Sequence, residues 1–504
     1  MPATMVRAQH LITRTLDRFR HEQIDDAALI QEDGVVTAIG GWEALRARYP
    51  DMPVLGTGNE VVLPGFVNSH HHVGLTPVQL GSPDMPLELW FVTRLVCRSV
   101  DLRLDTLYSA FEMLASGVTT VQHLHGWIPG DLPQVEAGAN RVISAYEEIG
   151  MRASYSLALR DQNRLAYQAD AELIASLPEP LRGPLSRHFG RFRLGLEDNF
   201  DLFRALRSRH AGKDRVQVQL APANLHWCSD AALERIADFS AAEDVPLHMH
   251  LLETPYQREY ARRRGGGSAV DYLDRFGLLT PRLTIGHGVW LDDGDINRLA
   301  ETGVCVCHNC SSNFRLRSGR APLNRLEDRG VRTAIGIDEA GLNDDRDMLQ
   351  EMRLVLRAHR VPGLDEADVP TPQQVLRMAT LGGAQTTGFV PRIGTLEVGK
   401  AADLVMIDWN QIAWPYLDAE MPVLDAVLHR AKASGVRATM VGGEVLYQDG
   451  RFTRIDRDAA LAALHEELSR ALTDEEVERR GLSKALLPHV RRFYADWIDP
   501  ASAR

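Results

Sequence analysis

Two histidines separated by one residue, His70 and His72, are the clearest sign of chemistry in the sequence. They end the segment PGFVNSHHH (64–72), which follows a short apolar stretch. In an extended chain, alternate side chains point to the same side, so both imidazoles can bind one cation while His71 points away. Because a solvated loop can carry the same pattern, the pair needs support from other residues.

Four more ionisable residues stand where later apolar segments end: His250, Glu253, His287 and Asp338. His250, in HMHLLET (248–254), is placed to supply a third imidazole. Glu253 is placed to act as a proton shuttle above a metal. His287 lies between two glycines, which let the backbone approach a ligand closely. Their recurrence at successive segment ends predicts one shared site.

Elements far apart in the sequence must bring these residues together. From about residue 61 to residue 387, short apolar segments alternate with amphipathic stretches, a pattern typical of repeated βαβ units. Eight units and the absence of a Gly-x-Gly-x-x-Gly turn favour a (β/α)8 TIM barrel, whose strand ends form one active-site face. The predicted strands are 61–67, 118–122, 152–159, 216–221, 246–250, 283–287, 304–308 and 332–338.

Both ends of the chain have short alternating segments broken by glycine turns. We expect residues 1–60 and 391–452 to form one small β-sandwich domain beside a barrel of residues 61–390. Residues 453–504 have helical periodicity and many charges, which predicts a C-terminal helical segment. Such a segment serves packing or dimerisation, or simply covers the core.

Composition is typical of a globular α/β protein, with 44% hydrophobic and 25% charged residues among 504. The net charge of −12 argues against nucleic acid or a membrane surface as a partner. No apolar run approaches the roughly 20 residues of a membrane span, and the N-terminal segment has no hydrophobic signal core. We expect a cytoplasmic enzyme with a small-molecule substrate. The five cysteines, an odd number, are expected to be reduced thiols.

Taken in order, the motifs resemble those of the amidohydrolase superfamily over nearly the whole chain. PGFVNSHHH is similar to that family's PG-x-x-N-x-H-x-H opening, and HMHLLET to the H-x-x-E segment of its aminohydrolase branch. GHGVWL, HNCSSNFRLRSGRAPL and GIDEAG look like the next three strand ends, and GTLEVGKAADLVMID like the return strand into the β domain. The branch it resembles includes cytosine, guanine and methylthioadenosine deaminases and triazine hydrolases.

This resemblance implies a role for each motif residue. The implied metal ligands are His70, His72, His250 and Asp338, and the implied catalytic residues are Glu253, His287 and Asp338. In dinuclear relatives a lysine on the fourth strand bridges two ions, but here no lysine occurs between Lys213 and Lys400. One divalent ion is therefore favoured over two. Zinc suits such a site, and iron or manganese would also fit.

A divalent ion held in this way lowers the pKa of a bound water from about 15.7 toward about 7. Asp338 and His287 would accept the proton of that water, and Glu253 would protonate a ring nitrogen and then the leaving amine. The leading hypothesis is a mononuclear aminohydrolase, a deaminase that releases ammonia from a small nitrogen heterocycle. The alternative is ring opening of a cyclic amide of imidazolone or hydantoin type. Triazine dehalogenation and a non-catalytic metalloprotein are more remote.

Other residues near the predicted strand ends are candidates for substrate binding. They are His123, His125, Arg160, Asn224, His226, Trp227, His308 and Asn309. Arg160, Arg315 and Arg317 are candidates to meet a substrate carboxylate, although surface ion pairing suits at least two of them better. The sequence leaves open the substrate, the native metal and whether the chain forms a homodimer or a larger assembly.

His248 and the cysteines beside His308 are harder to assign. Cys305 and Cys307 share one face of a predicted buried strand, where cysteine behaves as a small hydrophobe. We therefore do not favour a structural zinc site formed with Cys310. His248 shares a face with His250, and its role stays open between support of the site and a buried structural position.

Overall fold

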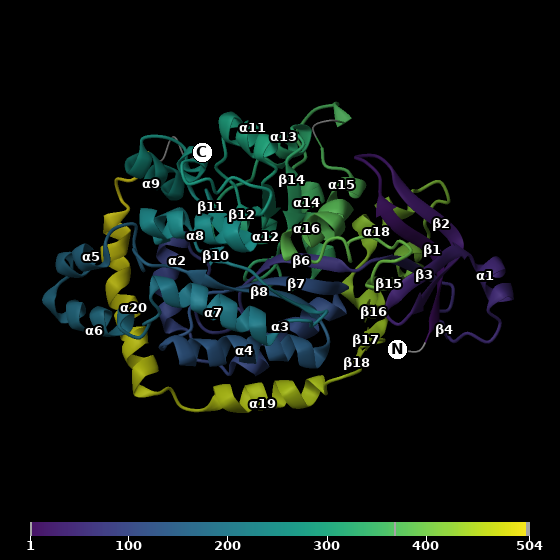
Figure 1. Cartoon of the computed structure of the whole chain (residues 1–504), viewed down its shortest axis with the longest axis horizontal. Coiled ribbons are helices and arrows are strands. Elements are labelled where there is room, and N and C mark those ends of the chain that lie inside the picture. Colours follow the sequence, from purple (N-terminus) through teal and green to yellow (C-terminus); the bar gives the residue numbers. More distant parts are fainter. Residues whose placement is uncertain (1–2, 367–368, 500–504) are drawn as a thin grey trace.

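The structure is a computed structural model that describes residues 3–366 and 369–499. At its centre, parallel strands alternate along the chain with helices (Figure 1). The strands form two sheets, ordered β10-β8-β7-β6, with β9 beside β8, and β11-β12-β13-β14. Their bounds are β6 Phe66–His71, β7 Val118–His125, β8 Arg152–Leu159, β9 Val216–Val218, β10 Ala221–Pro222, β11 Leu247–Leu251, β12 Leu283–His287, β13 Cys305–His308 and β14 Arg332–Ile335.

Isolated parallel bridges link the edges of the two sheets. Asn224, just after β10, pairs with His250 of β11, and His71 of β6 pairs with Asp338 beyond β14. Because parallel strands carry their carboxyl ends on the same side, residues at these ends can meet although they are distant in sequence. The expected α/β architecture with parallel sheets is confirmed.

Two of the predicted strands are divided in the structure. The predicted strand 61–67 becomes β5 (Glu60–Pro64) and β6, and the predicted strand 216–221 becomes β9 and β10. At the first division, a Cβ on Gly65 would lie 2.3 Å from Cγ2 of Thr119. Only glycine lets the backbone pass so close to β7 as it leaves one sheet and enters another.

Strands from both ends of the chain form a separate sheet. Its order is β18-β17-β16-β15-β5-β1-β2-β3, with β4 beside β1. The antiparallel pair of β5 and β15 joins the N-terminal strands of this sheet to its C-terminal strands. These strands form one nine-stranded sheet. Their remaining bounds are β1 Thr4–Thr15, β2 His21–Glu32, β3 Val35–Gly41, β4 Val54–Leu55, β15 Leu404–Asp408, β16 Val436–Val441, β17 Glu444–Gln448 and β18 Arg451–Phe452.

Helices pack around the central strands (Figure 1). Among the described residues, none of the helices has the length and apolar character needed to cross a membrane. Up to the second sheet they are α1 Trp42–Arg48, α2 Leu87–Thr93, η1 Arg94–Val96, α3 Leu102–Ala115, α4 Leu132–Ile149, α5 Asp170–Ser176, α6 Glu179–Phe189, α7 Leu196–Arg209, η2 Leu225–Trp227 and α8 Asp230–Glu243. Then follow α9 Pro255–Gly265, α10 Ala269–Asp274, α11 Asp293–Thr302, α12 Cys310–Arg315, α13 Leu323–Asp328, α14 Met348–Ala358, α15 Pro372–Arg377, η4 Met378–Gly382, α16 Gly383–Thr387, α17 Trp409–Ala413, α18 Val423–Arg430 and η5 Ala433–Gly435.

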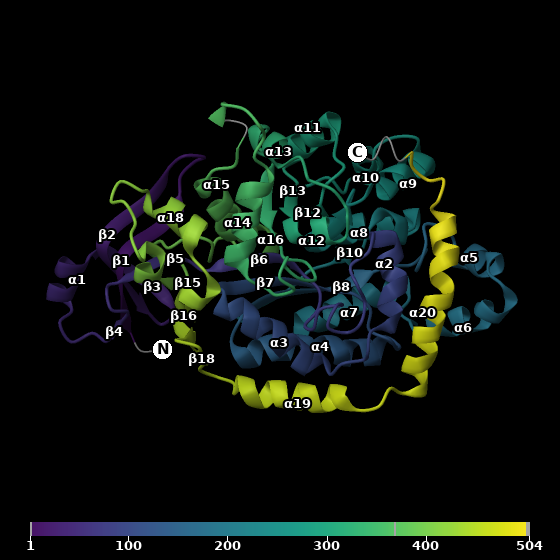
Figure 2. The same cartoon turned by 180° about the vertical axis from the view of Figure 1, so that it is seen from behind.

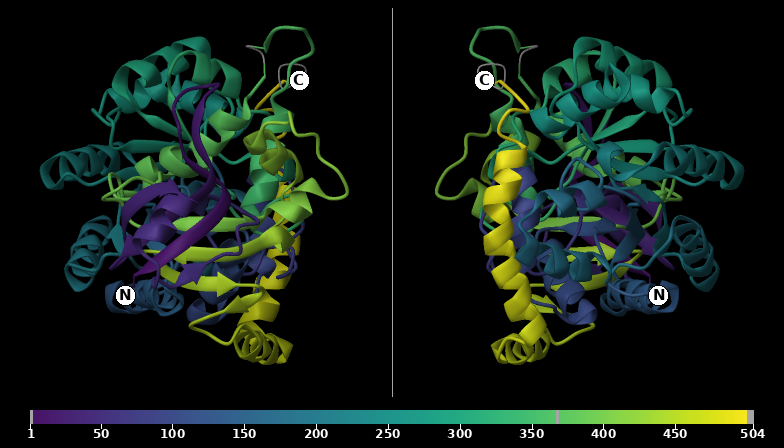
Figure 3. Two further views of the ribbon diagram at one scale, coloured as in Figure 1. Left: turned by 90° about the vertical axis from the view of Figure 1, so that its right-hand side faces the viewer. Right: turned by 90° about the vertical axis from the view of Figure 1, so that its left-hand side faces the viewer.

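Two C-terminal helices, α19 (Arg457–Ser469) and α20 (Asp474–Phe493), pack on the chain's own central region (Figures 2 and 3). Helix α19 contacts α3, and α20 contacts α2, η1 and α6. The Ser483 hydroxyl donates a hydrogen bond to the Val92 carbonyl at 2.8 Å, and Leu486 and Val490 are fully buried. The expected helical segment therefore covers α2 and the residues that follow it.

A buried ion pair ties the central sheet to the terminal sheet. At the start of β8, Nε and Nη2 of Arg152 donate to the carboxylate of Asp403 at 2.6 and 3.0 Å. The two side chains are 2% and 3% exposed. Asp403 also accepts a hydrogen bond from the Gly442 backbone N–H at 2.6 Å. Removal of either partner would leave a buried charge without compensation.

We expect Asp403→Ala to lower the free energy of unfolding by about 3–5 kcal/mol, because it leaves the buried Arg152 guanidinium without its carboxylate partner. Urea denaturation followed by circular dichroism measures the loss. The exposed pair of Arg235 and Glu197, 3.0 Å apart, is the control. There Glu197→Ala should cost at most about 1 kcal/mol, and equal losses in the two variants would contradict the prediction.

Candidate active site

Three imidazoles meet where β6 and β11 end. The Nε2 atoms of His70 and His72 are 3.0 Å apart, and each lies 3.1 Å from Nε2 of His250. His71 points elsewhere, and its Nε2 lies 3.2 Å from the Ser109 hydroxyl. The alternation expected for an extended segment thus brings His70 and His72 to the same side.

Asp338 adds a carboxylate to this cluster. Its Oδ1 lies 3.0 Å from Nε2 of His72 and 3.7 Å from Nε2 of His70. Its backbone N–H donates to the His70 carbonyl at 2.8 Å, which holds the carboxylate beside the rings. Burial acts to raise the pKa of Asp338, but the hydrogen bond and charge of His72 outweigh it and hold that pKa well below its usual value. Asp338 therefore faces the imidazoles as an anion.

Backbone carbonyls orient two of the three rings. Nδ1 of His72 donates to the Leu124 carbonyl at 2.5 Å, and Nδ1 of His250 to the Ala223 carbonyl at 2.7 Å. In a neutral ring such as that of His250, a proton on Nδ1 leaves the Nε2 lone pair for a cation. Burial lowers the pKa of His70 and His250 well below the usual value, so both rings are neutral.

This donor set fits one divalent ion. Neutral imidazole nitrogens and a carboxylate are ligands of zinc and related metals, with bonds of about 2.0–2.2 Å. Three Nε2 atoms 3.0–3.1 Å apart are close enough to share one ion at that bond length.

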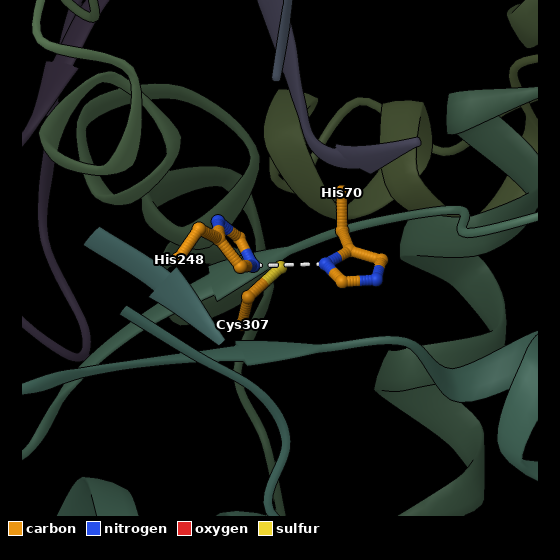
Figure 4. Close-up of side chains that lie close together, drawn as sticks. All are labelled: His70, His248 and Cys307. Carbon is orange, nitrogen blue, oxygen red and sulfur yellow. Dashed lines mark hydrogen bonds between the residues drawn. The ribbon is translucent and has the colours of Figure 1, made fainter. Parts of the chain in front are cut away.

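His248 lies beside His70 and faces Nδ1 of that ring (Figure 4), whereas Nε2 of His70 faces His72 and His250. Its Nε2 is 2.8 Å from Nδ1 of His70. The thiol of Cys307 lies beside both rings. Burial lowers the pKa of His248 to about 3 and raises the pKa of the Cys307 thiol, so both groups are neutral. His248 is thus placed to accept the Nδ1 proton of His70 and to leave Nε2 of His70 for the cluster.

Glu253 and His287 lie beside the cluster. Nε2 of His287 is 3.5 Å from Oδ2 of Asp338 and 3.7 Å from Oε2 of Glu253. Nδ1 of His287 donates to Asn313 Oδ1 at 2.9 Å, and the Ser318 hydroxyl donates to Glu253 at 3.2 Å. Burial raises the pKa of Glu253 to about 7. A carboxyl group with that pKa can give and take a proton near neutral pH.

Backbone strain marks the same strand ends. Leu252, His287 and Asp338 have φ values of 51°, 73° and 64°, a region that side chains other than glycine rarely adopt. Each costs about 1–3 kcal/mol and persists only where the surrounding structure imposes it. The strain therefore accompanies the placement of Glu253, His287 and Asp338 at one point.

A cavity of about 590 Å³ lies over this cluster. Its lining includes His72, His250, Glu253, His287 and Asp338. Of the residues predicted to bind substrate, Arg160, Asn224 and Trp227 also line it. These three come from the segments that follow β8 and β10.

The other predicted substrate-binding residues do not line this cavity in the described part of the chain. They are His123, His125, His226, His308 and Asn309. His123 lies 2.8 Å from the Tyr146 hydroxyl, and Nε2 of His308 lies 2.8 Å from Nε2 of His359. Arg315 forms ion pairs with Asp84 and Asp344, which is the role that the sequence favoured for at least two of the three arginines. Polar residues at a strand end can thus face the surrounding helices instead of the cavity.

Several residues that line the cavity were not singled out in the sequence. They are Trp90, Phe91, Arg94, Trp127, Glu339 and Arg479. Glu339 forms an ion pair with Arg94. Its position directly after Asp338 is the sequence signal that could have pointed to it. The aromatic residues of α2 resemble ordinary core residues in sequence. Arg479 belongs to α20, and the packing of this helix against α2, η1 and α6 brings it here.

The cysteines near His308 lie in two different surroundings. Cys305 and Cys307 pack with Ala334 in a small buried cluster, as expected for small hydrophobes. Cys310 lies with His308 and His359 instead. All five cysteines are buried and free, which agrees with the expected reduced thiols.

The chain belongs to the amidohydrolase family, whose sequence model matches residues 61–446. A curated relative, the 5-methylthioadenosine/S-adenosylhomocysteine deaminase of Nitratidesulfovibrio vulgaris, is 32% identical over 448 residues, which cover 88% of this chain and 92% of the relative. The 5′-deoxyadenosine deaminase of Methanosarcina mazei is 28% identical over 87% of this chain and 92% of the relative. The family that the motifs resemble is therefore confirmed.

Solved structures share the fold. An adenosine deaminase from Xanthomonas campestris with bound zinc superposes with a TM-score of 0.77 at 24% identity, over 92% of this chain and 97% of that chain. Atrazine chlorohydrolase from Arthrobacter aurescens, complexed with zinc, gives 0.76 at 21% identity, over 92% and 99%. At these identities the likeness speaks for the architecture alone.

We expect His248→Gln to weaken zinc binding by about 10- to 100-fold, because Nδ1 of His70 loses its partner. Competition with a chromogenic chelator measures the affinity. His465→Gln, on the exposed face of α19, is the matched control and should bind zinc as the unmodified protein does. An unchanged affinity in His248→Gln would show that the contact does not support the site.

Proposed function

We propose that this chain is a mononuclear metal-dependent deaminase that acts on an amino-substituted nitrogen heterocycle of the adenosine type. The observation that carries the proposal is the cluster of His70, His72, His250 and Asp338 beside Glu253, whose pKa is raised to about 7. Of these residues, His72, His250, Glu253 and Asp338 line one cavity. The curated relatives, named as deaminases of adenosine compounds, support the substrate class.

In this proposal the four residues of the cluster hold one zinc ion, which would supply the acidity that activates a water molecule. His287 Nε2 and Asp338 Oδ2, 3.5 Å apart, are placed to accept the proton that the water gives up. Glu253, whose Oε2 lies 3.7 Å from the same Nε2 of His287, donates a proton to a ring nitrogen and then to the leaving amine. The products are ammonia and the hydroxylated or oxo heterocycle.

Aromatic residues in the cavity suit a flat ring. Phe91 and Trp227 meet edge to face with centroids 5.0 Å apart, and both line the cavity. Such rings bind a heterocycle by stacking and exclude water from the reacting carbon. Asn224, at the end of β10, offers a side-chain amide to the same space, and its Nδ2 has no partner among the described residues.

We also propose that the two parallel sheets close into one (β/α)8 barrel of residues 61–390, supported by the bridges at both edges. Residues 1–60 and 391–452 would form the second domain. Bulges in β1 and in the β2–β3 pairing bend its sheet, which supports the expected sandwich shape. A cytoplasmic location and self-association into a homodimer or larger assembly stay predictions of the sequence.

The zinc-loaded protein should release ammonia from adenosine, 5′-deoxyadenosine or 5-methylthioadenosine, as a coupled ammonia assay and chromatography of the product would show. His250→Ala should lose both the metal and the activity, because it removes one of three imidazoles. If none of these compounds releases ammonia and a hydantoin or imidazolone gives a ring-opened product, the proposed reaction is wrong and the enzyme hydrolyses cyclic amides.

Glu253→Gln should keep its zinc and lose about 10²- to 10⁴-fold in kcat, because the amide cannot transfer a proton. The unmodified enzyme should lose kcat/KM as pH rises through about 7, where the raised pKa of Glu253 lets the carboxyl group ionise. This limb should be absent from the profile of Glu253→Gln. Glu234→Gln, on the exposed face of α8, should keep both the rate and the pH profile. If Glu253→Gln kept the pH profile of the unmodified enzyme, another group would transfer the proton.

A further inference from the structure

Arg160 holds its guanidinium between two indole rings in the cavity. Its Cζ lies 3.8 Å from the ring centroid of Trp227 and 4.4 Å from that of Trp127. Both rings are themselves packed, Trp227 against Phe91 at 5.0 Å and Trp127 against Phe192 at 4.8 Å between centroids. Stacking of this kind fixes the plane of a guanidinium without using its N–H donors.

These donors have no partner within the described residues. Nε of Arg160 is buried without a hydrogen bond, and no described carboxylate lies at ion-pairing distance from the guanidinium. Burial, with a smaller contribution from the charge of Arg94, lowers the pKa of Arg160 to about 9. The side chain is therefore still a cation at neutral pH. The protein fixes its orientation but places no carboxylate at ion-pairing distance to balance its charge.

The other arginines that line the cavity are compensated. Their carboxylate partners are Glu339 for Arg94, Glu476 for Arg98, Asp170 for Arg164, and Glu475 for Arg191 and Arg479. Among the described residues that line this space, Arg160 is thus the arginine without a carboxylate at ion-pairing distance, and Glu339 acts on its charge only from farther away. A fixed, unpaired cation in an aromatic cavity is a site for an anion.

We propose that Arg160 binds a carboxylate of the substrate, so that the enzyme prefers a heterocycle with one negative charge over its neutral analogue. The proposal rests on the deaminase function proposed above. One uncompensated guanidinium matches one negative charge, and its planar donors match the two oxygens of a carboxylate. A phosphate dianion would bring a second charge that no free cation in the described lining balances.

The test compares adenosine 5′-carboxylate, adenosine 5′-phosphate and the neutral 5-methylthioadenosine as substrates of the zinc-loaded enzyme. Arg160→Gln should lose roughly 100-fold in kcat/KM on the carboxylate, mainly through KM, and less than about threefold on the neutral compound. Arg160→Lys should recover part of the preference, since it keeps the charge but not the planar donors. Arg235→Gln removes an arginine that stacks on Phe200, outside this lining, and should change neither rate.

Equal losses on the charged and neutral compounds, or no preference in the unmodified enzyme, would overturn the proposal. A preference for the phosphate would overturn the assignment to a carboxylate.

Binding of benzoate and benzamide, followed by tryptophan fluorescence, tests the anion site without turnover. Benzoate should bind more tightly than benzamide, and Arg160→Gln should abolish the difference. If no adenosine compound yields ammonia, the proposed function fails, whereas equal binding of benzoate and benzamide overturns the anion site itself.

Discussion

The active site depends on one backbone hydrogen bond, from the Asp338 N–H to the His70 carbonyl at 2.8 Å. It joins the first strand of the central region to the segment that follows the last, and beside it the Asn68 side chain accepts the Ile337 N–H at 3.0 Å. Without this junction the carboxylate of Asp338 and the imidazoles of β6 would belong to opposite edges of two sheets. The fold therefore makes the donor set by bringing two distant edges into register.

Burial acts on every ionisable group here, and the neighbours decide the outcome. For His70 and His250, loss of water lowers the pKa, and nearby imidazoles add to the effect, so both remain neutral donors. Asp338 is equally buried, but contact with His72 keeps it anionic. Glu253 lacks so close a partner, and its pKa rises to about 7. One cavity thus holds carboxyl groups in two different protonation states, which is what acid–base chemistry beside a metal requires.

The cavity owes part of its character to segments outside the central strands. Helix α2 brings aromatic rings, and α20 covers α2 and adds Arg479. Ion pairs neutralise most of the arginines in this lining, whereas aromatic stacking holds Arg160 in place without neutralising it. Because stacking leaves the N–H donors free, it can present a charge to a ligand while the protein stays ordered around it.

The sequence by itself predicted the parallel α/β architecture and the meeting of His70, His72, His250 and Asp338. These residues end strands, and the alternation of side chains along a strand is a local property that spacing reveals. It did not reveal that His123 and His308 face other side chains, that α20 reaches the cavity, or that Arg160 has no acidic partner. Those outcomes depend on which surfaces meet when distant elements pack, and on the balance of burial and neighbouring charge at each group. Only the tertiary structure decides them, because contacts between elements distant in sequence leave no periodic pattern along the chain.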